Sequence, residues 1–358
     1  MKDVADSQES DGLKPLDDGD LIPEAAEPIP YSVLGRHLAP VADLLKRPDI
    51  SEIVVNEPGV VWFERAGQAH MERRDQPEYT GDKMMRLANA VASASGQRIS
   101  GTAPLLSAQI PDVGRMQLVK APAVENGVAM AIRRATQKAF SLQDYRDNGM
   151  FEGENLTDIG TMTDDDRALL ALYEGGDIYE FIRQAVIQKK NIVVSGGTSS
   201  GKTTFANALL GEVAPMDRII TIEDTRELLP PQGNHLALIA SRGGQSRAKV
   251  DAVTLLEASL RLRPDRIILG ELRGVEAYPF IRAINTGHPG AITTIHADTP
   301  GGALDQIAFL VLQYGLSLDL DRVREYVARQ IDVIIQLGRR NGERRVEKVF
   351  YRHAKSEL

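Results

Sequence analysis

The chain has 358 residues, enough for two domains of ordinary size. It contains no cysteine, which excludes disulfides, thiolate zinc sites, iron–sulfur clusters and cysteine nucleophiles. The formal net charge is −8, but residues 1–30 hold nine acidic residues and two lysines and so account for −7 of it. The rest of the chain is therefore almost neutral, and its composition gives no support for nucleic-acid binding.

Residues 1–30 also contain four prolines and no aromatic residue, a composition typical of a disordered tail. An acidic docking peptide is the alternative interpretation. The stretch has neither the positively charged nor the apolar region of a signal peptide. Apolar runs elsewhere are too short to span a bilayer, so we expect that any work at a membrane depends on docking.

Residues 31–140 show a mixed pattern. The spacing of apolar residues predicts amphipathic helices at 33–45 and 82–95. Short β-rich runs predict one hairpin at 53–63 and a second at 116–132. The sequence therefore predicts a small α+β domain at 31–140.

The next 36 residues, 141–176, are polar and rich in glycine, with one short helix predicted near 167–173. The stretch is long for a linker, which suggests a packing role. From 177 to 358 helices and short apolar strands alternate, which predicts a mainly parallel sheet with helices on both faces. Strands are expected at 192–194, 218–222, 267–269 and 291–295, and helices at 202–210, 253–262, 275–285 and 303–313.

The strongest signal is a stretch that matches G-x4-G-K-[ST] and lies between a predicted strand and a predicted helix. Such a loop turns backbone N–H groups around a phosphate, and the helix N-terminus adds its positive dipole end. We expect Lys202 to reach the β- and γ-phosphates of ATP and Thr203 to be a ligand of Mg²⁺. The expected nucleotide-binding residues are Gly196, Gly197, Thr198, Ser199, Ser200, Gly201, Lys202, Thr203 and Thr204.

Two acidic residues follow predicted strands, where open α/β sheets place their ligands. Glu271 comes after the strand at 267–269 and Gly270, and Glu223 directly follows the strand at 218–222. We assign Glu271 as the carboxylate that activates water and as a second Mg²⁺ ligand, and Glu223 as a helper that polarises or holds the water. The alternative is that either acid simply closes a strand at the surface.

His296 follows the strand at 291–295 and would face the same sheet edge as Glu271. It could sense the γ-phosphate, or it could be a hydrogen-bonded structural histidine. ATP hydrolysis at one such loop is usually slow without an added positive charge on the transition state. Arg115 and Arg133, at strand ends of the first predicted domain, are candidates, and solvated surface charge is the alternative.

Four motifs in this order resemble the type II/type IV secretion ATPase superfamily. They are the loop at 196–203, the acidic box at 221–228, Gly270-Glu271-Leu272-Arg273, and the box that runs from Gly287-His288 to His296. The segment from Arg98 through 107–115 to Arg133 is similar to the N-terminal domain of the type IV branch, which serves conjugation and effector export. The resemblance covers about residues 31–350.

The resemblance implies a RecA-like P-loop ATPase domain preceded by a smaller α+β domain. It also implies a cytoplasmic homohexamer that is peripheral to the inner membrane and that binds ATP and Mg²⁺. Its partners would be inner-membrane secretion components and a secreted protein or nucleoprotein, with no sequence-specific nucleic-acid binding. By this likeness Arg115 and Arg133 are the γ-phosphate contacts. A helicase-like motor, a pilus-retraction ATPase and a nucleotide switch without hydrolysis are the alternatives.

Overall fold

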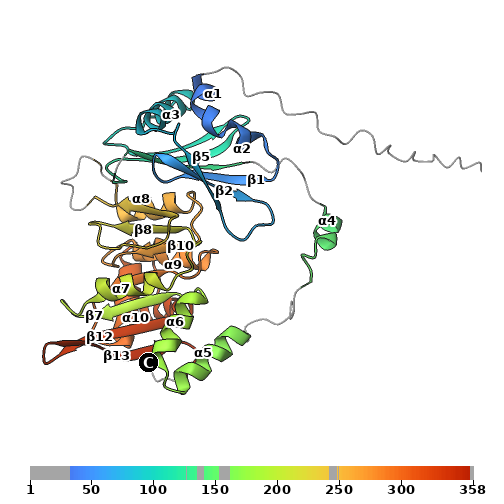
Figure 1. Cartoon of the computed structure of the whole chain (residues 1–358). Coiled ribbons are helices and arrows are strands. Elements are labelled where there is room, and N and C mark those ends of the chain that lie inside the picture. Colours follow the sequence, from blue (N-terminus) through green and yellow to red (C-terminus); the bar gives the residue numbers. More distant parts are fainter. Residues whose placement is uncertain are drawn as a thin grey trace, which may run out of the picture.

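The structure is a computed structural model that describes residues 33–125, 127–134, 141–152, 162–241, 248 and 250–354. Two sheets organise it, one of six strands and one of seven (Figure 1). The first sheet lies within residues 50–133 and the second within 192–351. This agrees with the predicted class, a RecA-like P-loop domain that follows a smaller α+β domain. The predicted tail at 1–30 lies outside the described residues.

The first sheet is antiparallel and has the order β3-β2-β1-β6-β5-β4. Its strands are β1 (Ile50–Val55), β2 (Gly59–Arg65), β3 (Glu72–Gln76), β4 (Leu105–Ile110), β5 (Gly114–Lys120) and β6 (Val128–Arg133). Both predicted hairpins are present as β1–β2 and β5–β6 pairs. Neither β3 nor β4 was predicted from the sequence. The residues of β3 are polar and lack the apolar alternation of a half-buried strand, whereas β4 shows that alternation and was missed.

Helices cover one face of this sheet. They are α1 (Val33–Leu38), the 3-10 turn η1 (Ala39–Val41), α2 (Ala42–Lys46) and α3 (Gly81–Ala94). The single helix expected at 33–45 is broken at η1, because Pro40 has no N–H for a regular helical hydrogen bond. Leu87 and Val91 of α3 pack with Ile53 and Ile132 of the sheet in a buried apolar core.

The second sheet has the order β13-β12-β7-β11-β10-β8-β9, and every pair in it is parallel except β12–β13. Its strands are β7 (Ile192–Gly196), β8 (Ile219–Glu223), β9 (His235–Ile239), β10 (Arg266–Leu269), β11 (Ile292–Ile295), β12 (Val333–Arg340) and β13 (Glu343–Tyr351). Consecutive parallel strands need crossover connections, which helices supply here except between β8 and β9. The predicted parallel sheet is therefore confirmed, with a C-terminal hairpin added at one edge.

Helices lie on both faces of the second sheet, as the alternation predicted. Their bounds are α6 (Ile178–Ile187), α7 (Lys202–Gly211), α8 (Ala252–Ser259), α9 (Ala277–Asn285), α10 (Pro300–Leu312) and α11 (Leu320–Gln330). One buried core holds Phe181 of α6 and Leu210 of α7 with Val194 of the sheet. Another core holds Ile281 of α9 and Ile307 of α10 with Val193. Val193 and Val194 thus face opposite sides, as successive strand residues do.

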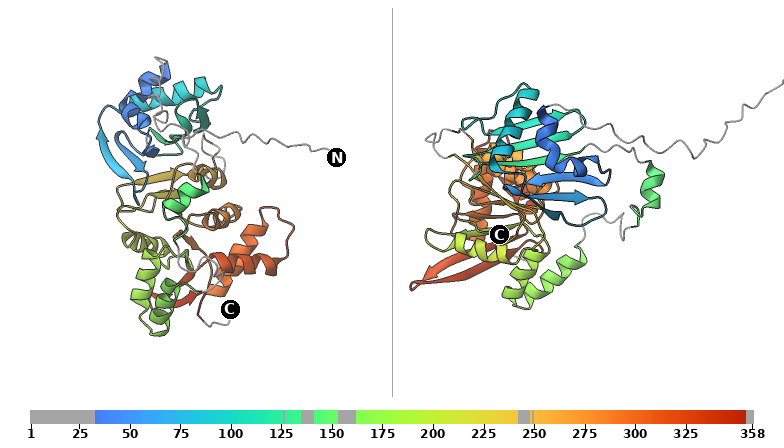
Figure 2. Two further views of the ribbon diagram at one scale, coloured as in Figure 1. Left: turned by 90° about the vertical axis from the view of Figure 1, so that its right-hand side faces the viewer. Right: turned by 45° about the horizontal axis from the view of Figure 1, so that its top comes forward.

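The first sheet packs on the β8–β9 side of the second domain (Figures 1 and 2). Val124 forms an antiparallel bridge with Leu238 of β9, and the Ile239 N–H donates to the Ala123 carbonyl at 2.8 Å. The fully buried Arg218 donates from one guanidinium nitrogen to Asn56 of the first domain at 2.8 Å. The first domain therefore covers the outer edge of β9, which would otherwise expose unpaired backbone groups.

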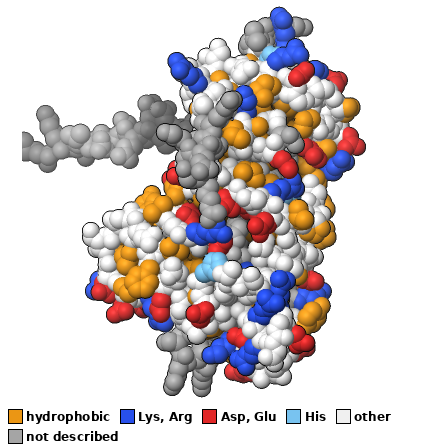
Figure 3. Space-filling view, turned by 90° about the vertical axis from the view of Figure 1, so that its left-hand side faces the viewer, with side chains coloured by type: hydrophobic (Ala, Val, Ile, Leu, Met, Phe, Trp, Pro, Cys, Tyr) orange, Lys and Arg blue, Asp and Glu red, His pale blue; other side chains and the backbone are white. Residues whose placement is uncertain are grey.

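The surface carries both signs of charge over both domains (Figure 3). Lys and Arg side chains alternate with Asp and Glu side chains on the face that the figure presents. This agrees with the nearly neutral charge of the chain after residue 30. None of the helices in the described ranges combines the length and the apolar composition that a bilayer crossing requires.

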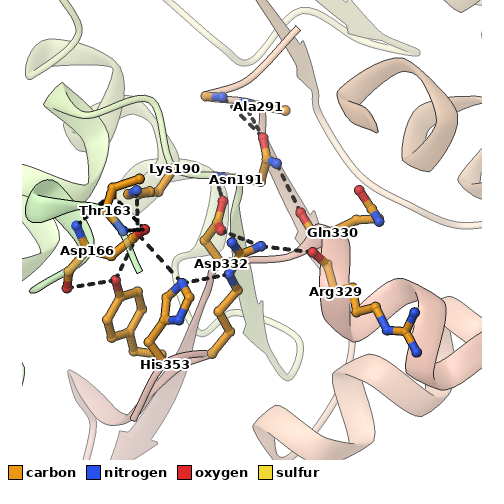
Figure 4. A network of polar contacts seen from close by, with 12 residues as sticks. Thr163, Asp166, Lys190, Asn191, Ala291, Arg329, Gln330, Asp332 and His353 are labelled. Atoms are coloured by element: carbon orange, nitrogen blue, oxygen red, sulfur yellow. Dashed lines mark hydrogen bonds and ion pairs between the residues drawn. The ribbon is translucent and has the colours of Figure 1, made fainter. Parts of the chain in front are cut away.

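Two helices occupy the described parts of the predicted connector, α4 (Leu142–Asp147) and α5 (Asp164–Glu174). Helix α5 is held to the second domain by a polar network around Asp166 (Figure 4). One Asp166 oxygen accepts from Lys190 Nζ at 2.7 Å, and the other accepts from the Thr163 hydroxyl, also at 2.7 Å. Tyr351 Oη donates to the Asp166 carbonyl at 3.2 Å. The end of the connector is thus part of the packed domain.

Opposing effects act on the pKa of Asp166. Burial acts to raise the pKa of this carboxyl, but the hydrogen bonds from Lys190 and Thr163 outweigh burial and hold the pKa below its usual range. An acid whose pKa is lowered by folding stabilises the fold fully above its unfolded pKa. That stabilisation is lost as the pH falls through the folded pKa.

We predict that Asp166→Asn lowers the free energy of unfolding at neutral pH by about 1–3 kcal/mol, because Lys190 then loses its charge partner in a largely buried place. The matched control is Asp164→Asn, whose side chain is 91% exposed and pairs with Arg167. It should change stability by no more than about 0.5 kcal/mol. Urea unfolding followed by circular dichroism measures both. Equal effects of the two substitutions would contradict the anchoring role of Asp166.

Candidate active site

The carboxyl ends of four parallel strands meet at one edge of the second sheet. Ser195 of β7 pairs in register with Ile295 of β11, and Leu269 of β10 pairs with Thr293 of β11 and Ile222 of β8. The predicted site residues follow or end these strands. Because the strands run parallel, residues far apart in the chain reach the same edge.

The predicted phosphate loop joins β7 to α7. Gly201 has a φ of +91°, a left-handed conformation that glycine adopts without strain. Most longer helices of the chain begin with a side-chain cap, such as Thr80 on α3 and Asp251 on α8, but α7 has none. Its first backbone N–H groups therefore have no side-chain acceptor. In the same loop the Ser200 hydroxyl is buried and has no hydrogen-bond partner in the described part of the chain.

Uncapped N–H groups and an unpaired hydroxyl in one loop are what an anion with several oxygens would satisfy. A phosphate group fits this description, since it offers acceptors and negative charge together. The loop therefore has the features expected of a nucleotide-binding loop.

Lys202 lies at the centre of a chain of polar contacts. Its Nζ donates to the carbonyls of Gly196 at 2.9 Å and Gly197 at 3.2 Å, and it lies 3.3 Å from His296 Nδ1. An ammonium group only donates, so His296 Nδ1 must accept. Burial lowers the pKa of Lys202, and the negative charge of Glu271 opposes that shift.

His296 connects Lys202 to Glu271. With Nδ1 accepting, the ring proton of the neutral imidazole is on Nε2, which lies 3.0 Å from Glu271 Oε1. Arg273 forms an ion pair with the other Glu271 oxygen, and it also donates to Asp224 at 3.0 Å. The Glu271 side chain is only 16% exposed. Lys202, His296 and Glu271 are thus brought together, as the order of strands predicted.

Glu223 lies beside Glu271 and is buried. Its Oε1 accepts the backbone N–H groups of Glu227 at 2.9 Å and Leu228 at 3.0 Å, so one oxygen closes the turn after β8. Its Oε2 is buried and has no partner among the described residues. Burial raises the pKa of Glu223, and the two backbone hydrogen bonds oppose that rise. One oxygen is therefore structural, and the other is available.

Gly270 separates β10 from Glu271 and has a steric role toward Glu223. A Cβ at this position would lie 2.9 Å from Glu223 Cγ, which is closer than packed carbon atoms approach. The absence of a side chain at 270 thus leaves room for Glu223. Sequence reasoning placed Gly270 in the motif but did not find this packing role. It also missed the pairing of Arg273 with Glu271, although Arg273 lies only two residues further along.

A pocket of about 280 Å³ opens at this edge. Thr203, Glu223, Asp224 and Glu271 are among its lining residues. Hydroxyl and carboxylate oxygens are the ligands that Mg²⁺ prefers, and neither Glu271 Oε1 nor Glu223 Oε2 accepts a hydrogen bond from the described residues, so the donor set fits that ion. No cluster of three or more His, Cys, Asp or Glu side chains suited to holding a metal by protein ligands alone occurs within the described ranges. A Mg²⁺ ion here would rely on phosphate and water oxygens as well.

The two predicted arginines lie elsewhere. Arg115 of β5 and Arg133 of β6 are directly opposite each other and exposed. They share the sheet face of Val119 and Ala131, which packs toward the second domain. Arg133 Nε is 3.6 Å from Glu52 of β1, and burial raises the pKa of Glu52 to about 7. In the parts of the chain that are described, no hydrogen bond or ion pair joins either arginine to residues 196–203.

The fold and this edge define a class of protein, the RecA-like P-loop nucleoside triphosphatases. Comparison with known sequences narrows the class. Residues 173–349 match the profile of the family described as "Type II/IV secretion system protein". The type IV secretion system protein VirB11 of Bartonella henselae is 39% identical over 88% of this chain and 91% of that protein. PtlH of Bordetella pertussis is 38% identical over 88% of this chain and 94% of that protein.

A solved structure agrees with these relatives. The VirB11 ATPase from the type IV secretion system of Brucella suis, crystallised in complex with sulphate, superposes with a TM-score of 0.82 at 36% identity. The match covers 89% of this chain and 98% of that chain. The chain therefore belongs to the type II/IV secretion system protein family, on its type IV branch, and the resemblance drawn from the four ordered motifs is confirmed.

We predict that Gly270→Ala lowers the free energy of unfolding by about 1–3 kcal/mol, because the added Cβ overlaps Glu223. The matched control is Gly211→Ala at the end of α7, where an added Cβ meets nothing within 4 Å. This control should be neutral, or more stable by about 0.5–1 kcal/mol, since alanine favours helix. Thermal unfolding of both variants distinguishes them. A Gly270→Ala protein as stable as the control would show that Glu223 does not depend on Gly270.

Proposed function

We propose that the chain hydrolyses ATP at the loop of residues 196–203 and that hydrolysis powers a type IV secretion or conjugation machine. The observation that carries the proposal is the contact chain from Lys202 through His296 to Glu271 beside an uncapped helix start. It combines a cation for phosphates with a carboxylate for water. The names of the relatives, which include a VirB11 ATPase, support both the activity and the machine.

Binding begins with an exchange of partners. Lys202 leaves the carbonyls of Gly196 and Gly197 for β- and γ-phosphate oxygens, while the first N–H groups of α7 and the Ser200 hydroxyl take up the phosphates. Thr203 and Glu271 are the residues that would hold Mg²⁺, which supplies positive charge against the β- and γ-phosphate oxygens. Lys202 then offers a charge-assisted hydrogen bond to the γ-phosphate, where negative charge must be stabilised.

Glu271 is the group that orients the attacking water and accepts its proton. Its Oε1 lies 3.0 Å from His296 Nε2, although this oxygen accepts no hydrogen bond from the described residues, so the imidazole is the side chain that lies between the carboxylate and Lys202. A change at the γ-phosphate that moves Lys202 is therefore transmitted to the carboxylate through one side chain. Glu223, with its unpaired Oε2 in the same pocket, assists by holding the water. Product release and the relaxation of these contacts would let the two domains rotate.

Arg115 and Arg133 complete the site in this proposal by acting on a neighbouring subunit. Both are exposed, and within one chain neither has a described contact with the loop. Their like charges lie side by side, and only Glu52 partly balances Arg133, so a pair of cations is available for phosphate. A closed ring, for which we propose six copies, would bring this face to the next cleft.

The remaining parts of the proposal concern place and partners. We infer that the ring is cytoplasmic and docks at the inner membrane on other secretion components, and that it moves a protein or nucleoprotein. The nearly neutral surface outside the first 30 residues supports a protein contact over sequence-specific nucleic-acid binding. Stimulation of ATP hydrolysis by single-stranded DNA that is lost at raised salt would favour a helicase-like motor instead.

We predict that Lys202→Ala reduces steady-state phosphate release at least about 100-fold, because the transition state loses a preorganised cation. The fold should persist, as circular dichroism and thermal unfolding would show. Lys46→Ala, which removes an exposed lysine from α2, is the control and should keep full activity. Undiminished turnover by the Lys202→Ala protein would refute the proposed site.

The role of the arginines between subunits has its own test. Arg133→Ala and Lys202→Ala proteins should each be inactive. Mixed in equal amounts under conditions that allow subunit exchange, they should recover part of the activity, because some clefts then combine an intact Lys202 with an intact Arg133. If both proteins form mixed rings and no activity returns, Arg133 does not act on a neighbouring cleft. Light scattering of the particle with and without ATP and Mg²⁺ supplies the ring size.

A further inference from the structure

A second pocket, of about 370 Å³, lies on the other side of the phosphate loop. Ser200 and Gly201 of the loop line it, and its remaining lining comes from α7, including Thr204, and from the β12–β13 hairpin. We propose that this pocket binds the base of the nucleotide and that Arg344 of β13 covers the ring. The inference rests on the proposed nucleotide site and assigns the part of that site that receives the nucleoside.

The order of the strands determines which way a bound nucleotide would point along the sheet edge. The acids lie on the β10 and β8 side of β7, whereas β12 and β13 lie on its opposite side. A triphosphate whose γ-phosphate faces Glu271 must therefore extend its nucleoside end toward the β12–β13 hairpin. Thr204, one residue beyond the Mg²⁺-binding Thr203, lies where the loop opens into the second pocket.

The lining suits a flat aromatic ring. Phe205 and Ala208 of α7 face Leu337 of β12 and Val346 of β13 across the pocket. Of these, Val346 is 37% exposed, so part of the apolar lining is open to solvent. A base inserted between α7 and the hairpin would bury this apolar surface, and each face of the ring would meet hydrocarbon or a guanidinium group.

Arg344 is placed to form one wall. A Cβ at Gly201 would lie 3.0 Å from Arg344 Cδ and 3.3 Å from its Nε, so the side chain lies directly over the loop. Its neighbours on the hairpin are engaged, since Arg340 pairs with Glu347 at 2.9 Å and Arg345 with Glu343 at 4.0 Å. Arg344 has no acid within ion-pair distance among the residues that the structure describes. A planar guanidinium without an acidic partner can stack on the face of a base.

The β12–β13 hairpin projects from the edge of the second sheet. It extends beyond the helices that cover the rest of the sheet (Figure 1), and the first six residues of β13 are exposed. Glu347 packs against Gly338, where a Cβ would lie only 2.1 Å from the carboxyl carbon. The two strands of the hairpin are thus in contact through Glu347 and Gly338, and β13 holds Arg344 over the loop without a covering helix.

The test compares ATP with inorganic tripolyphosphate, which has the phosphates but no base. Binding of each, with Mg²⁺, is measured by calorimetry on the full chain. Arg344→Ala should weaken ATP roughly 3- to 30-fold and leave tripolyphosphate unchanged, because only the stacked ring loses its partner. Arg344→Lys should keep the charge but lose most of the ATP affinity that depends on the planar group. Arg339→Ala, on the same hairpin, is the control and should change neither.

Two results would overturn the inference. Equal weakening of ATP and tripolyphosphate by Arg344→Ala would place Arg344 on the phosphates, and unchanged ATP binding would remove it from the site. Val346→Asp gives an independent measure, since a charge in the apolar wall should also weaken ATP alone. Lys202→Ala tests the proposed phosphate site independently of the base pocket. If this variant loses binding of both ATP and tripolyphosphate, the phosphate site is supported, and that result does not depend on the outcome for Arg344→Ala.

Discussion

The parallel register of β7, β11, β10 and β8 is the constraint on which the rest of the structure depends. It brings Lys202, Glu271 and His296, which are up to 94 residues apart, to one edge of one sheet. A slip of one residue in any of these pairings would turn a site side chain to the opposite face. The buried apolar residues on both faces of the sheet oppose such a slip, because they fill two different cores. The positions of the site residues at this edge therefore depend on the two apolar cores, which lie away from the site.

The two sides of the phosphate loop carry different kinds of residue. Acids gather on the β10 and β8 side of the phosphate loop, and an apolar surface with two arginines, Arg344 and Arg345, lies on the β12 and β13 side. The first domain covers the edge of β9 and is joined to the second domain through Asn56 and Arg218, while α5 is anchored at Asp166. Movements of the first domain therefore act on β8 and β9, next to the acids. In the function that we propose, this contact is the route from hydrolysis to motion, and the exposed Arg115 and Arg133 are available to another copy.

Much of the second sheet and of the candidate site could be predicted from the sequence, because the motifs that mark them are local stretches of the chain. Apolar strands followed by glycine or acid, and the loop motif itself, marked β7, β10 and β11 and placed Lys202, Glu271 and His296 on one edge. The signals failed where structure depends on distant partners. Strand β3 is polar, and β13 begins with six exposed residues, so neither has an apolar pattern of its own. Strands β4, β9 and β12 contain apolar residues and were nevertheless not predicted. The steric role of Gly270 toward Glu223, and the position of Arg344 over Gly201, arise only when separate segments meet.

The most direct measurement is a structure of the chain with a non-hydrolysable ATP analogue and Mg²⁺ at a resolution that shows side chains. We expect the triphosphate along the loop of residues 196–203, with Lys202 Nζ moved from the carbonyls to the γ-phosphate. Glu271 should lie across from that phosphate and still be in contact with His296. A nucleotide bound away from this loop, or a Glu271 carboxylate that faces away from the γ-phosphate, would contradict the account.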